Sequence, residues 1–259
     1  RDDVESRGLG DVYKRQEQIY TGVLENEQFQ VIDGCMFGGW TYTGESFALA
    51  DVKLLAPLVP NQIIGIGANF VATKEELPSE LPEIPIFFNK PVASVIGPND
   101  EIKIPKGVDE IKFESELAVI IGKEMKDVAV ENVLDYVFGY TVTNDVTAPQ
   151  FFVNNGGNWF VGKSFDTFTP LGPFIETELN PKDVVVEAYV NGIQKQNSST
   201  ELMIVPIREM IAYLSSVTTL KPGDVILTGS PVGAEFIGHQ DEISCEIKQI
   251  GVLKNRLVK

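Results

Sequence analysis

The sequence predicts an α+β fold in which β-strands dominate, and three observations support this. Short runs of Val, Ile and aromatic residues recur along the chain, bounded by Gly, Pro, Asn and Asp, which is the pattern of β-strands. Only two segments, 130–138 and 206–217, place apolar residues at helical spacing. Asn191-Gly192, between two strand-like runs, is a strong signal for a two-residue hairpin turn.

The expected strands fall into a small leading group and a larger second group. They cover 18–24, 29–32, 63–67, 84–88, 101–104, 113–122, 139–143, 184–190, 193–196, 225–228, 243–247 and 252–258. The first two flank Glu25-Asn26-Glu27 and suggest a hairpin in a small N-terminal subdomain, 17–58. Residues 54–60, with two prolines, predict a connection into a main domain, 59–259.

In the two expected helices, the apolar residues lie on a single stripe, which indicates core packing and carries no functional weight. The stripes consist of Val130, Val133, Leu134 and Val137 in the first helix and of Ile207, Met210, Ile211 and Leu214 in the second.

The first 16 residues are treated separately. The string SRGLGDVYKRQ within them is similar to the in-frame translation of a transposase sequencing adapter, so we leave 1–16 out of the fold prediction. On this interpretation the native start codon and a few residues are missing. The alternative is a natural disordered tail. The charges of the segment cancel, so the rest of the chain still carries the net charge of −16.

Composition is that of a globular protein and excludes some classes of partner. With 259 residues, 43% apolar and 22% charged, the chain can bury a sizeable core. The net charge of −16 argues against nucleic acid and against an anionic membrane surface. An anionic substrate stays possible, because a bound cation dominates its local field. Cys35 and Cys245 lack metal-like spacing, and no apolar run approaches the roughly 20 residues of a membrane helix. We therefore expect a cytoplasmic protein.

Three separate segments bring carboxylates and a lysine that together predict a metal site. Glu114 and Glu116 are two apart, so on a strand they point to the same face. Asp145 follows Thr143-Asn144, and Lys163 begins the run KSFDT. Carboxylates without a nearby histidine favour a hard ion, Mg²⁺ or Mn²⁺ before Zn²⁺. Taken alone, Glu-x-Glu is also typical of a solvated strand face.

These segments resemble blocks of the fumarylacetoacetate hydrolase family. The blocks are FESELAVIIGK, DYVFGYTVTNDVTA, GKSFDTFTPLGPFI, LKPGDVILTGSPVG and IGVLKNRLV, in family order, within a resemblance that runs from about Glu17 to Lys259. The resemblance implies that Glu114, Glu116 and Asp145 hold a divalent cation and that Lys163 is the family lysine. It also implies a mixed sheet rolled into a barrel-like shape, a small N-terminal β subdomain packed alongside, and a homodimer.

The resemblance further implies the chemistry. A 2-oxo acid or 1,3-dicarbonyl acid would chelate the cation, which stabilises the enolate formed when a carbon–carbon bond breaks or a proton moves. Lys163 would add a positive charge near the carboxylate or enolate. Thr228, Gly229 and Ser230 follow a strand, and Ser230 could donate to an oxyanion. These three residues are either another turn or a substrate contact, and the resemblance favours substrate contact.

The chain departs from the family in the lid that carries the water-activating base. Where the family has Tyr, then His three residues later and Glu three further on, this chain has Phe70, Thr73 and Glu76. Threonine is no base near neutral pH, so Glu76, Glu75 or another group would have to substitute. Residues 70–85 are rich in proline and glutamate and are either a mobile lid or an ordinary acidic surface loop.

A second departure follows the aspartate. The family places Arg-Asp after the alanine of Asn-Asp-x-x-Ala, whereas this chain has Pro149-Gln150, so an arginine that grips an anionic group is missing. Two other features carry little weight. The segment from Gly65 to Phe70 lacks the third glycine of a dinucleotide loop. His239, the single histidine, lies in an expected turn without an orienting partner.

Three functions follow from these observations. The first is a metal-dependent isomerase, tautomerase or decarboxylase acting on a 2-oxo acid or its enol, because these reactions need enolate stabilisation more than an activated water. The second is a C–C bond hydrolase of the acylpyruvate or fumarylacetoacetate type, with a glutamate from 70–83 as base. The third is a protein that binds metal and oxo acid without turnover.

Overall fold

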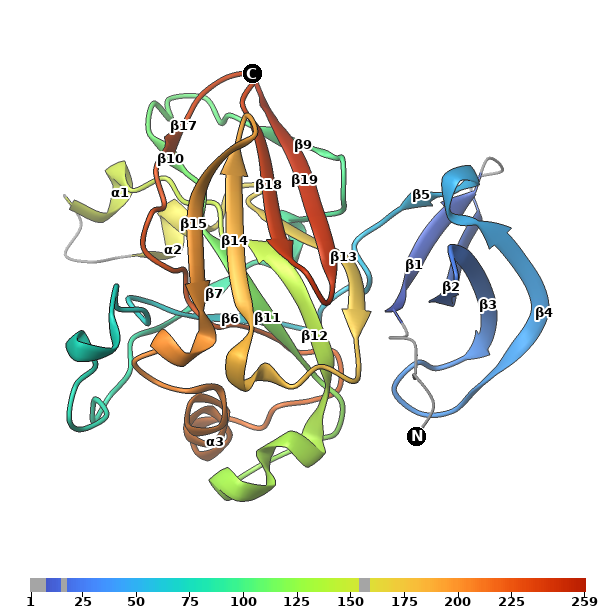
Figure 1. The fold of residues 1–259 in the computed structure, drawn as a ribbon, viewed down its shortest axis with the longest axis horizontal. Coiled ribbons are helices and arrows are strands. Elements are labelled where there is room, and N and C mark those ends of the chain that lie inside the picture. Colours follow the sequence, from blue (N-terminus) through green and yellow to red (C-terminus); the bar gives the residue numbers. More distant parts are fainter. Residues whose placement is uncertain (1–7, 15–17, 154–158) are drawn as a thin grey trace.

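The computed structural model describes residues 8–14, 18–153 and 159–259, and strands make up most of its regular structure (Figure 1). The strands are β1 (Gly8–Lys14), β2 (Gln18–Glu25), β3 (Gln28–Gly34), β4 (Trp40–Ala48), β5 (Lys53–Leu54), β6 (Ile63–Ile66), β7 (Phe87–Lys90), β8 (Val95–Ile96), β9 (Glu101–Lys103), β10 (Ile111–Lys112), β11 (Ser115–Ile121), β12 (Val137–Asn144), β13 (Thr169–Glu176), β14 (Val185–Val190), β15 (Ile193–Ser199), β16 (Val225–Leu227), β17 (Phe236–Ile237), β18 (Glu242–Ile247) and β19 (Gly251–Val258).

Helices are short and few in the described residues. The α-helices are α1 (Gln150–Val153), α2 (Trp159–Lys163) and α3 (Ile207–Val217). The 3-10 helices are η1 (Leu49–Asp51), η2 (Lys74–Glu76), η3 (Val92–Ser94), η4 (Val130–Tyr136), η5 (Pro181–Asp183) and η6 (Thr200–Leu202).

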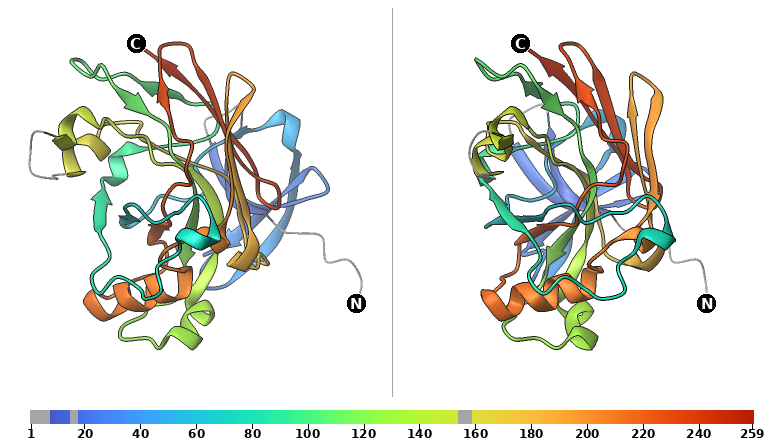
Figure 2. Two further views of the ribbon diagram at one scale, coloured as in Figure 1. Left: turned by 60° about the vertical axis from the view of Figure 1, so that its left-hand side comes forward. Right: turned by 90° about the vertical axis from the view of Figure 1, so that its left-hand side faces the viewer.

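Two sheets form the body of the molecule. The larger has the strand order β4-β3-β2-β1-β13-β12-β11-β16-β6-β7, and the five-stranded second sheet has the order β15-β14-β18-β19-β9. The second sheet packs on β11, β12 and β13, as Figures 1 and 2 show. Most pairs are antiparallel, but β16–β6, β19–β9 and β13–β8 are parallel. The prediction of a β-rich fold with a rolled mixed sheet is confirmed.

The core explains why the segment after the carboxylates is wholly apolar. Every residue of β11 is buried. Leu117, Val119 and Ile121 point into one hydrophobic cluster, whereas Ala118 and Ile120 belong to another. A strand covered on both faces needs apolar residues at successive positions, not alternate ones. Each buried Leu or Ile contributes about 1.5–3 kcal/mol, so β11 is a rigid platform for the residues at its start.

The N-terminal strands β1 to β4 continue the large sheet through the pairing of β1 with β13. Phe29, Val31 and Phe47 form a small hydrophobic cluster within this part. The segment left out of the fold prediction therefore contributes a strand, because β1 pairs with β2 from Gly8 opposite Leu24 to Lys14 opposite Gln18. Residues 1–7 and 15–16 of that segment lie outside the described residues. Its origin from an adapter, and the division at residue 58, stay predictions.

The second predicted helix is confirmed, and the first is wrong in type. Helix α3 follows Pro206 and buries Ile207, Met210, Ile211 and Leu214, its predicted stripe. The segment predicted over 130–138 is instead the 3-10 helix η4, and strand β12 begins at Val137. Of its stripe only Val133 is fully buried, while Val130 is 38% exposed, so packing does not support an α-helix there.

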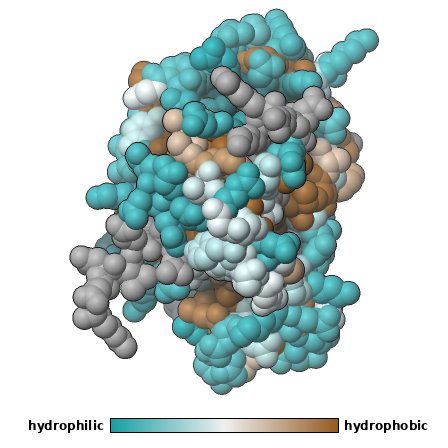
Figure 3. Space-filling view, turned by 90° about the vertical axis from the view of Figure 1, so that its right-hand side faces the viewer, coloured by the Kyte–Doolittle hydropathy of each residue, from teal (hydrophilic) through white to brown (hydrophobic). Residues whose placement is uncertain are grey.

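Two further differences affect the site. The strand predicted at 84–88 is β7 at Phe87–Lys90, which extends past Phe88 to include a lysine. The strand β13 at Thr169–Glu176 was not predicted, because its two prolines and a glycine indicate a loop. Within the described residues, no helix is both long enough and apolar enough to cross a membrane. Figure 3 shows that hydrophilic residues cover most of the face on the β1–β4 side, with hydrophobic residues in separate patches.

Candidate metal centre

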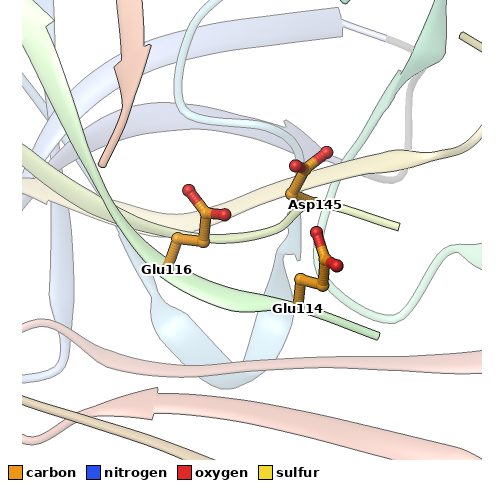
Figure 4. Close-up of side chains that lie close together, drawn as sticks. All are labelled: Glu114, Glu116 and Asp145. Atoms are coloured by element: carbon orange, nitrogen blue, oxygen red, sulfur yellow. The ribbon is translucent and has the colours of Figure 1, made fainter. Parts of the chain in front are cut away.

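Three carboxylates converge where two neighbouring strands meet. Glu114 immediately precedes β11, Glu116 lies in it, and Asp145 follows β12. Because β11 and β12 are antiparallel and pair Ser115 with Asn144, the start of one strand lies beside the end of the other. One oxygen from each carboxylate lies within 4.8 Å of the other two, and Figure 4 shows the three side chains pointing toward a common space. The predicted trio is therefore one spatial cluster.

Hydrogen bonds fix the backbone that carries these acids. The Asp145 N–H donates to the Glu114 carbonyl at 2.8 Å, and the Glu114 N–H donates to Asn144 Oδ1 at 2.9 Å. The Thr147 hydroxyl donates to Glu114 Oε2 at 3.1 Å, and the Gly229 N–H donates to Glu116 Oε2 at 2.8 Å. The carboxylates are thus held in place by the protein itself, as a pre-formed binding site requires.

Lys163 joins the cluster from the end of α2. Its ammonium donates to Glu114 Oε2 at 2.5 Å and to Asp145 Oδ2, and lies 4.7 Å from the centre of the Phe88 ring. Burial by itself lowers the pKa of Lys163, but the carboxylates of Asp145, Glu114 and Glu116 outweigh burial and raise it above its usual value. Lys163 is therefore a permanent positive charge at neutral pH.

A second lysine, which the sequence analysis did not identify, lies behind Asp145. Lys90, the last residue of β7, donates to Asp145 Oδ1 at 2.5 Å and to the Val146 carbonyl at 3.2 Å. Burial lowers the pKa of Lys90, and Lys163 lowers it further, against the opposing effect of Asp145. Burial would raise the pKa of Asp145, but the two lysines lower it overall, so Asp145 is an anion.

The surroundings of Glu116, unlike those of Asp145, disfavour its ionised form. Its pKa is raised well above 4.5, mainly by burial and then by the charge of Asp145. A divalent cation among the three acids would offset this cost, because coordination favours the ionised form. All the ligand atoms are oxygens, the set that Mg²⁺ and Mn²⁺ prefer. The donor set thus fits a hard divalent ion.

The acids open into a cavity of about 180 Å³. Its walls are formed by Ile66, Gly67, Ala68, Lys112, Glu114, Glu116, Asp145, Phe152, Trp159, Lys163, Ser230, Pro231 and Ala234. A larger cavity of about 540 Å³ lies between η5, η6 and α3. Among the described residues, only the trio forms a group of acidic, histidine or cysteine side chains able to hold a metal. The presence of this trio therefore identifies the 180 Å³ cavity as the candidate site.

The residues after β16 divide into one that faces the cavity and two that support it. Ser230 lines the cavity, and its hydroxyl accepts from Gln196 Nε2 at 2.8 Å. Gly229 has φ +92°, and a Cβ there would lie 2.7 Å from the Asn69 Cβ, so glycine permits the N–H contact with Glu116. Thr228 is buried and donates to the Leu117 carbonyl at 2.8 Å, away from the cavity lining. Substrate contact by these residues stays a prediction.

Glu76, the candidate base, does not belong to the cavity lining. It lies in η2 on the surface, and its carboxylate accepts from the Ala72 N–H at 3.0 Å. Thr73 is exposed as well, and Pro149 is outside the cavity lining. His239 is exposed in a turn, 3.2 Å from the Gln240 amide. The structure therefore brings the metal trio and Lys163 together but not the suggested substitute base.

The charged and aromatic residues at the site that were not predicted from the sequence are Lys90, Lys112, Phe152 and Trp159. The rings of Phe152 and Trp159 stack at 5.6 Å and form one wall. Neither ring belongs to a periodic pattern, so no signal indicated them. Lys112 had a signal, because it continues the alternation of Glu114 and Glu116 by one step.

Comparison with known families gives two matches. The family model described as Fumarylacetoacetate (FAA) hydrolase C-terminal matches residues 62–258. The model described as Rv2993c-like, N-terminal, matches residues 13–57.

Individual relatives carry names of several enzymes. The mitochondrial oxaloacetate tautomerase of Xenopus laevis is 40% identical over 221 residues, covering 81% of this chain and 69% of that protein. The crystal structure of 5-carboxymethyl-2-hydroxymuconate delta-isomerase from Mycobacterium smegmatis has a TM-score of 0.90 at 38% identity and covers 97% of this chain and 99% of that one. The structure of maleylpyruvate hydrolase from Sphingobium sp. SYK-6 has a TM-score of 0.80 at 29% identity, with 97% and 99% covered.

Proposed function

The chain belongs to the fumarylacetoacetate hydrolase family, an enzyme family, and we propose that it is a divalent-metal-dependent isomerase, tautomerase or decarboxylase acting on a 2-oxo acid or its enol. The observation that carries the proposal is the convergence of Glu114, Glu116 and Asp145, with Lys163 beside them, in one cavity. We propose Mg²⁺ or Mn²⁺ as the ion. The homodimer and the cytoplasmic location stay predictions.

The chain's own residues would act through fixed charge. A divalent ion held by the trio supplies Lewis-acid stabilisation of an enolate. The ammonium of Lys163 stays protonated and buried, so it offers a pre-organised positive charge to an oxyanion without reorganisation. The Ser230 hydroxyl lines the same cavity and can donate a hydrogen bond. Phe152 and Trp159 cover one side with apolar surface, which limits water near the reacting carbons.

Proton movement is favoured over hydrolysis by what lines the cavity. Hydrolysis of a carbon–carbon bond needs an activated water, and within the described cavity lining no histidine is present, while Glu76 lies outside it. The names of the Xenopus laevis and Mycobacterium smegmatis relatives, a tautomerase and an isomerase, agree with this preference. The Sphingobium relative is named a hydrolase, so C–C bond hydrolysis remains the second candidate.

The proposal is tested by proton NMR in D₂O on the full chain stripped of metal and then supplied with Mg²⁺ or Mn²⁺. Oxaloacetate and an acylpyruvate are the substrates. We expect metal-dependent exchange or tautomerisation at C3 of oxaloacetate, or its decarboxylation, and loss of the reaction in Lys163→Met. Stoichiometric cleavage of the acylpyruvate to two acids would favour the hydrolase. Binding without any turnover would contradict both and leave the non-catalytic function.

A further inference from the structure

Lys112 contributes a positive charge to the cavity that no acidic side chain neutralises. It is half-buried and lines the same cavity as the three carboxylates. In the part of the chain that the structure describes, no carboxylate lies within ion-pairing distance of its ammonium. Lys163 and Lys90, by contrast, both form ion pairs with Asp145. Lys112 is thus available to an anion that enters the cavity.

The backbone holds Lys112 firmly next to the acids. Its N–H donates to the Thr147 carbonyl at 2.8 Å, and its carbonyl accepts from the Thr147 N–H at 3.0 Å. On its other side, β10 pairs Lys112 with Phe236 of β17. Thr147 in turn donates its hydroxyl to Glu114. Hydrogen bonds through Thr147 therefore connect the main chain of Lys112 to the side chain of Glu114, a proposed metal ligand.

The alternation of side chains explains why Lys112 faces the cavity. Lys112, Glu114 and Glu116 are two apart and all line it. The intervening Phe113 is fully buried in the core, and the Ser115 hydroxyl donates to the Glu187 carbonyl. One extended segment thus presents one lysine and two acids to the same side.

Lys112 brings to the cavity a positive charge that Pro149, at the position of the family arginine, cannot provide. Proline has no charge, so the side chain after Ala148 offers no grip on an anionic group, and Pro149 is outside the cavity lining. A charge-assisted hydrogen bond from an ammonium to a carboxylate is about twice as strong as a neutral one. A free ammonium in a small, partly apolar cavity therefore selects ligands that bring a carboxylate to it.

We propose that Lys112 binds the second carboxylate of a 2-oxo dicarboxylic acid whose oxo-acid end lies at Glu114, Glu116 and Asp145. The proposal rests on the proposed function, because it takes the oxo-acid end to be bound at the acid cluster. Lys112 is then a residue that determines specificity: it distinguishes a dicarboxylate from a monocarboxylate of the same length and does not enter the proton transfer.

The test measures dissociation constants for matched pairs of acids in the presence of Mn²⁺. Oxaloacetate is compared with 2-oxobutyrate, and 2-oxoglutarate with 2-oxopentanoate, because each pair differs only in a terminal carboxylate or methyl. We expect the wild type to prefer the diacid of at least one pair. In Lys112→Met that diacid should bind about 10- to 100-fold more weakly, as for one lost charged hydrogen bond, and the monoacid should change less than about twofold. Lys112→Arg should keep most of the preference.

Lys103→Met, at an exposed lysine of β9 outside the cavity, is the control for a change in net charge. Equal weakening of both acids in Lys112→Met, or no change in either, would overturn the role of Lys112. Metal-dependent binding of the monoacids without a diacid preference in the wild type would overturn this inference alone and leave the proposed function standing. If none of the four acids binds with metal, both proposals fail.

Discussion

Lys90 and Asp145 form an ion pair that is sealed from solvent. The Lys90 ammonium donates to Asp145 Oδ1 at 2.5 Å, and the two side chains are 0% and 1% exposed. The other Asp145 oxygen accepts from Lys163. Asp145 is therefore held between two ammonium groups, which aims it at the acid cluster and keeps it ionised.

Removing Lys90 should lower stability because the buried carboxylate of Asp145 would lose one of its two ammonium partners. Lys90→Met should lower the free energy of unfolding by about 3–5 kcal/mol, the usual effect of breaking a buried pair. Lys53→Met is the matched control, because Lys53 forms an ion pair of similar length with Asp100 but is 54% exposed, and it should cost about 0–1 kcal/mol. Denaturant unfolding of metal-free protein measures both. Equal losses would show that burial of the Lys90 pair does not matter.

Replacing Glu116 should stabilise the metal-free protein in a pH-dependent way. Burial and then Asp145 raise the pKa of Glu116, so the folded state binds its proton more readily than the unfolded state. The cost of ionising Glu116 is absent below its unfolded pKa, near 4.5, and is fully present above its folded pKa. Glu116→Gln should therefore gain stability over the wild type as pH rises, by about 1.4 kcal/mol for each unit of raised pKa.

That comparison is made by unfolding both proteins in chelator at several pH values between 4.5 and 8. A difference that stays constant with pH would contradict the raised pKa. Saturating Mn²⁺ should reverse the order at pH 8, since a ligand bound by the folded wild type stabilises it and the glutamine variant has lost one charged ligand.

Glycine at position 67 leaves room for the ring of Trp159, which forms part of the cavity wall. A Cβ at this position would lie 1.8 Å from a ring carbon of Trp159, so Gly67→Ala must displace the indole. We expect a loss of about 1–3 kcal/mol in stability, as for other overpacked sites, together with a changed Trp fluorescence. Trp40 is the second tryptophan, so a Trp40→Phe background assigns the signal to Trp159. Gly39→Ala is the control, because a Cβ there meets nothing within 4 Å. An unchanged spectrum would contradict this packing.

The elements that could be predicted from the sequence are those whose local pattern of apolar residues matches their burial in the fold. The apolar run of β11 and the stripe of α3 were predicted because burial determines both patterns. Strand β13 was missed because Pro170 and Pro173 argue against a central strand. In the structure the ladder with β12 shifts register between Tyr140 and Val142, which accommodates residues that cannot donate to it.

At the site, sequence could identify charges but not their partners. Glu114, Glu116, Asp145 and Lys163 were predicted from alternation and family resemblance, and the structure brings them together. Lys90 could not be predicted, because lysines are almost never fully buried and its partner Asp145 is 55 residues away. Glu76 was chosen by its spacing in the lid, and only the folded chain shows that it lies outside the cavity lining.

The central claim is that Glu114, Glu116 and Asp145 bind a divalent ion and present it to an oxo acid. The most direct measurement titrates metal-free protein with Mn²⁺, followed by electron paramagnetic resonance, before and after addition of oxalate, a stable mimic of the enolate of a 2-oxo acid. We predict one bound Mn²⁺ per chain, oxalate binding only when Mn²⁺ is present, and loss of both in Glu116→Gln. Mn²⁺ that binds equally well to Glu116→Gln, or oxalate that binds without metal, would contradict the account.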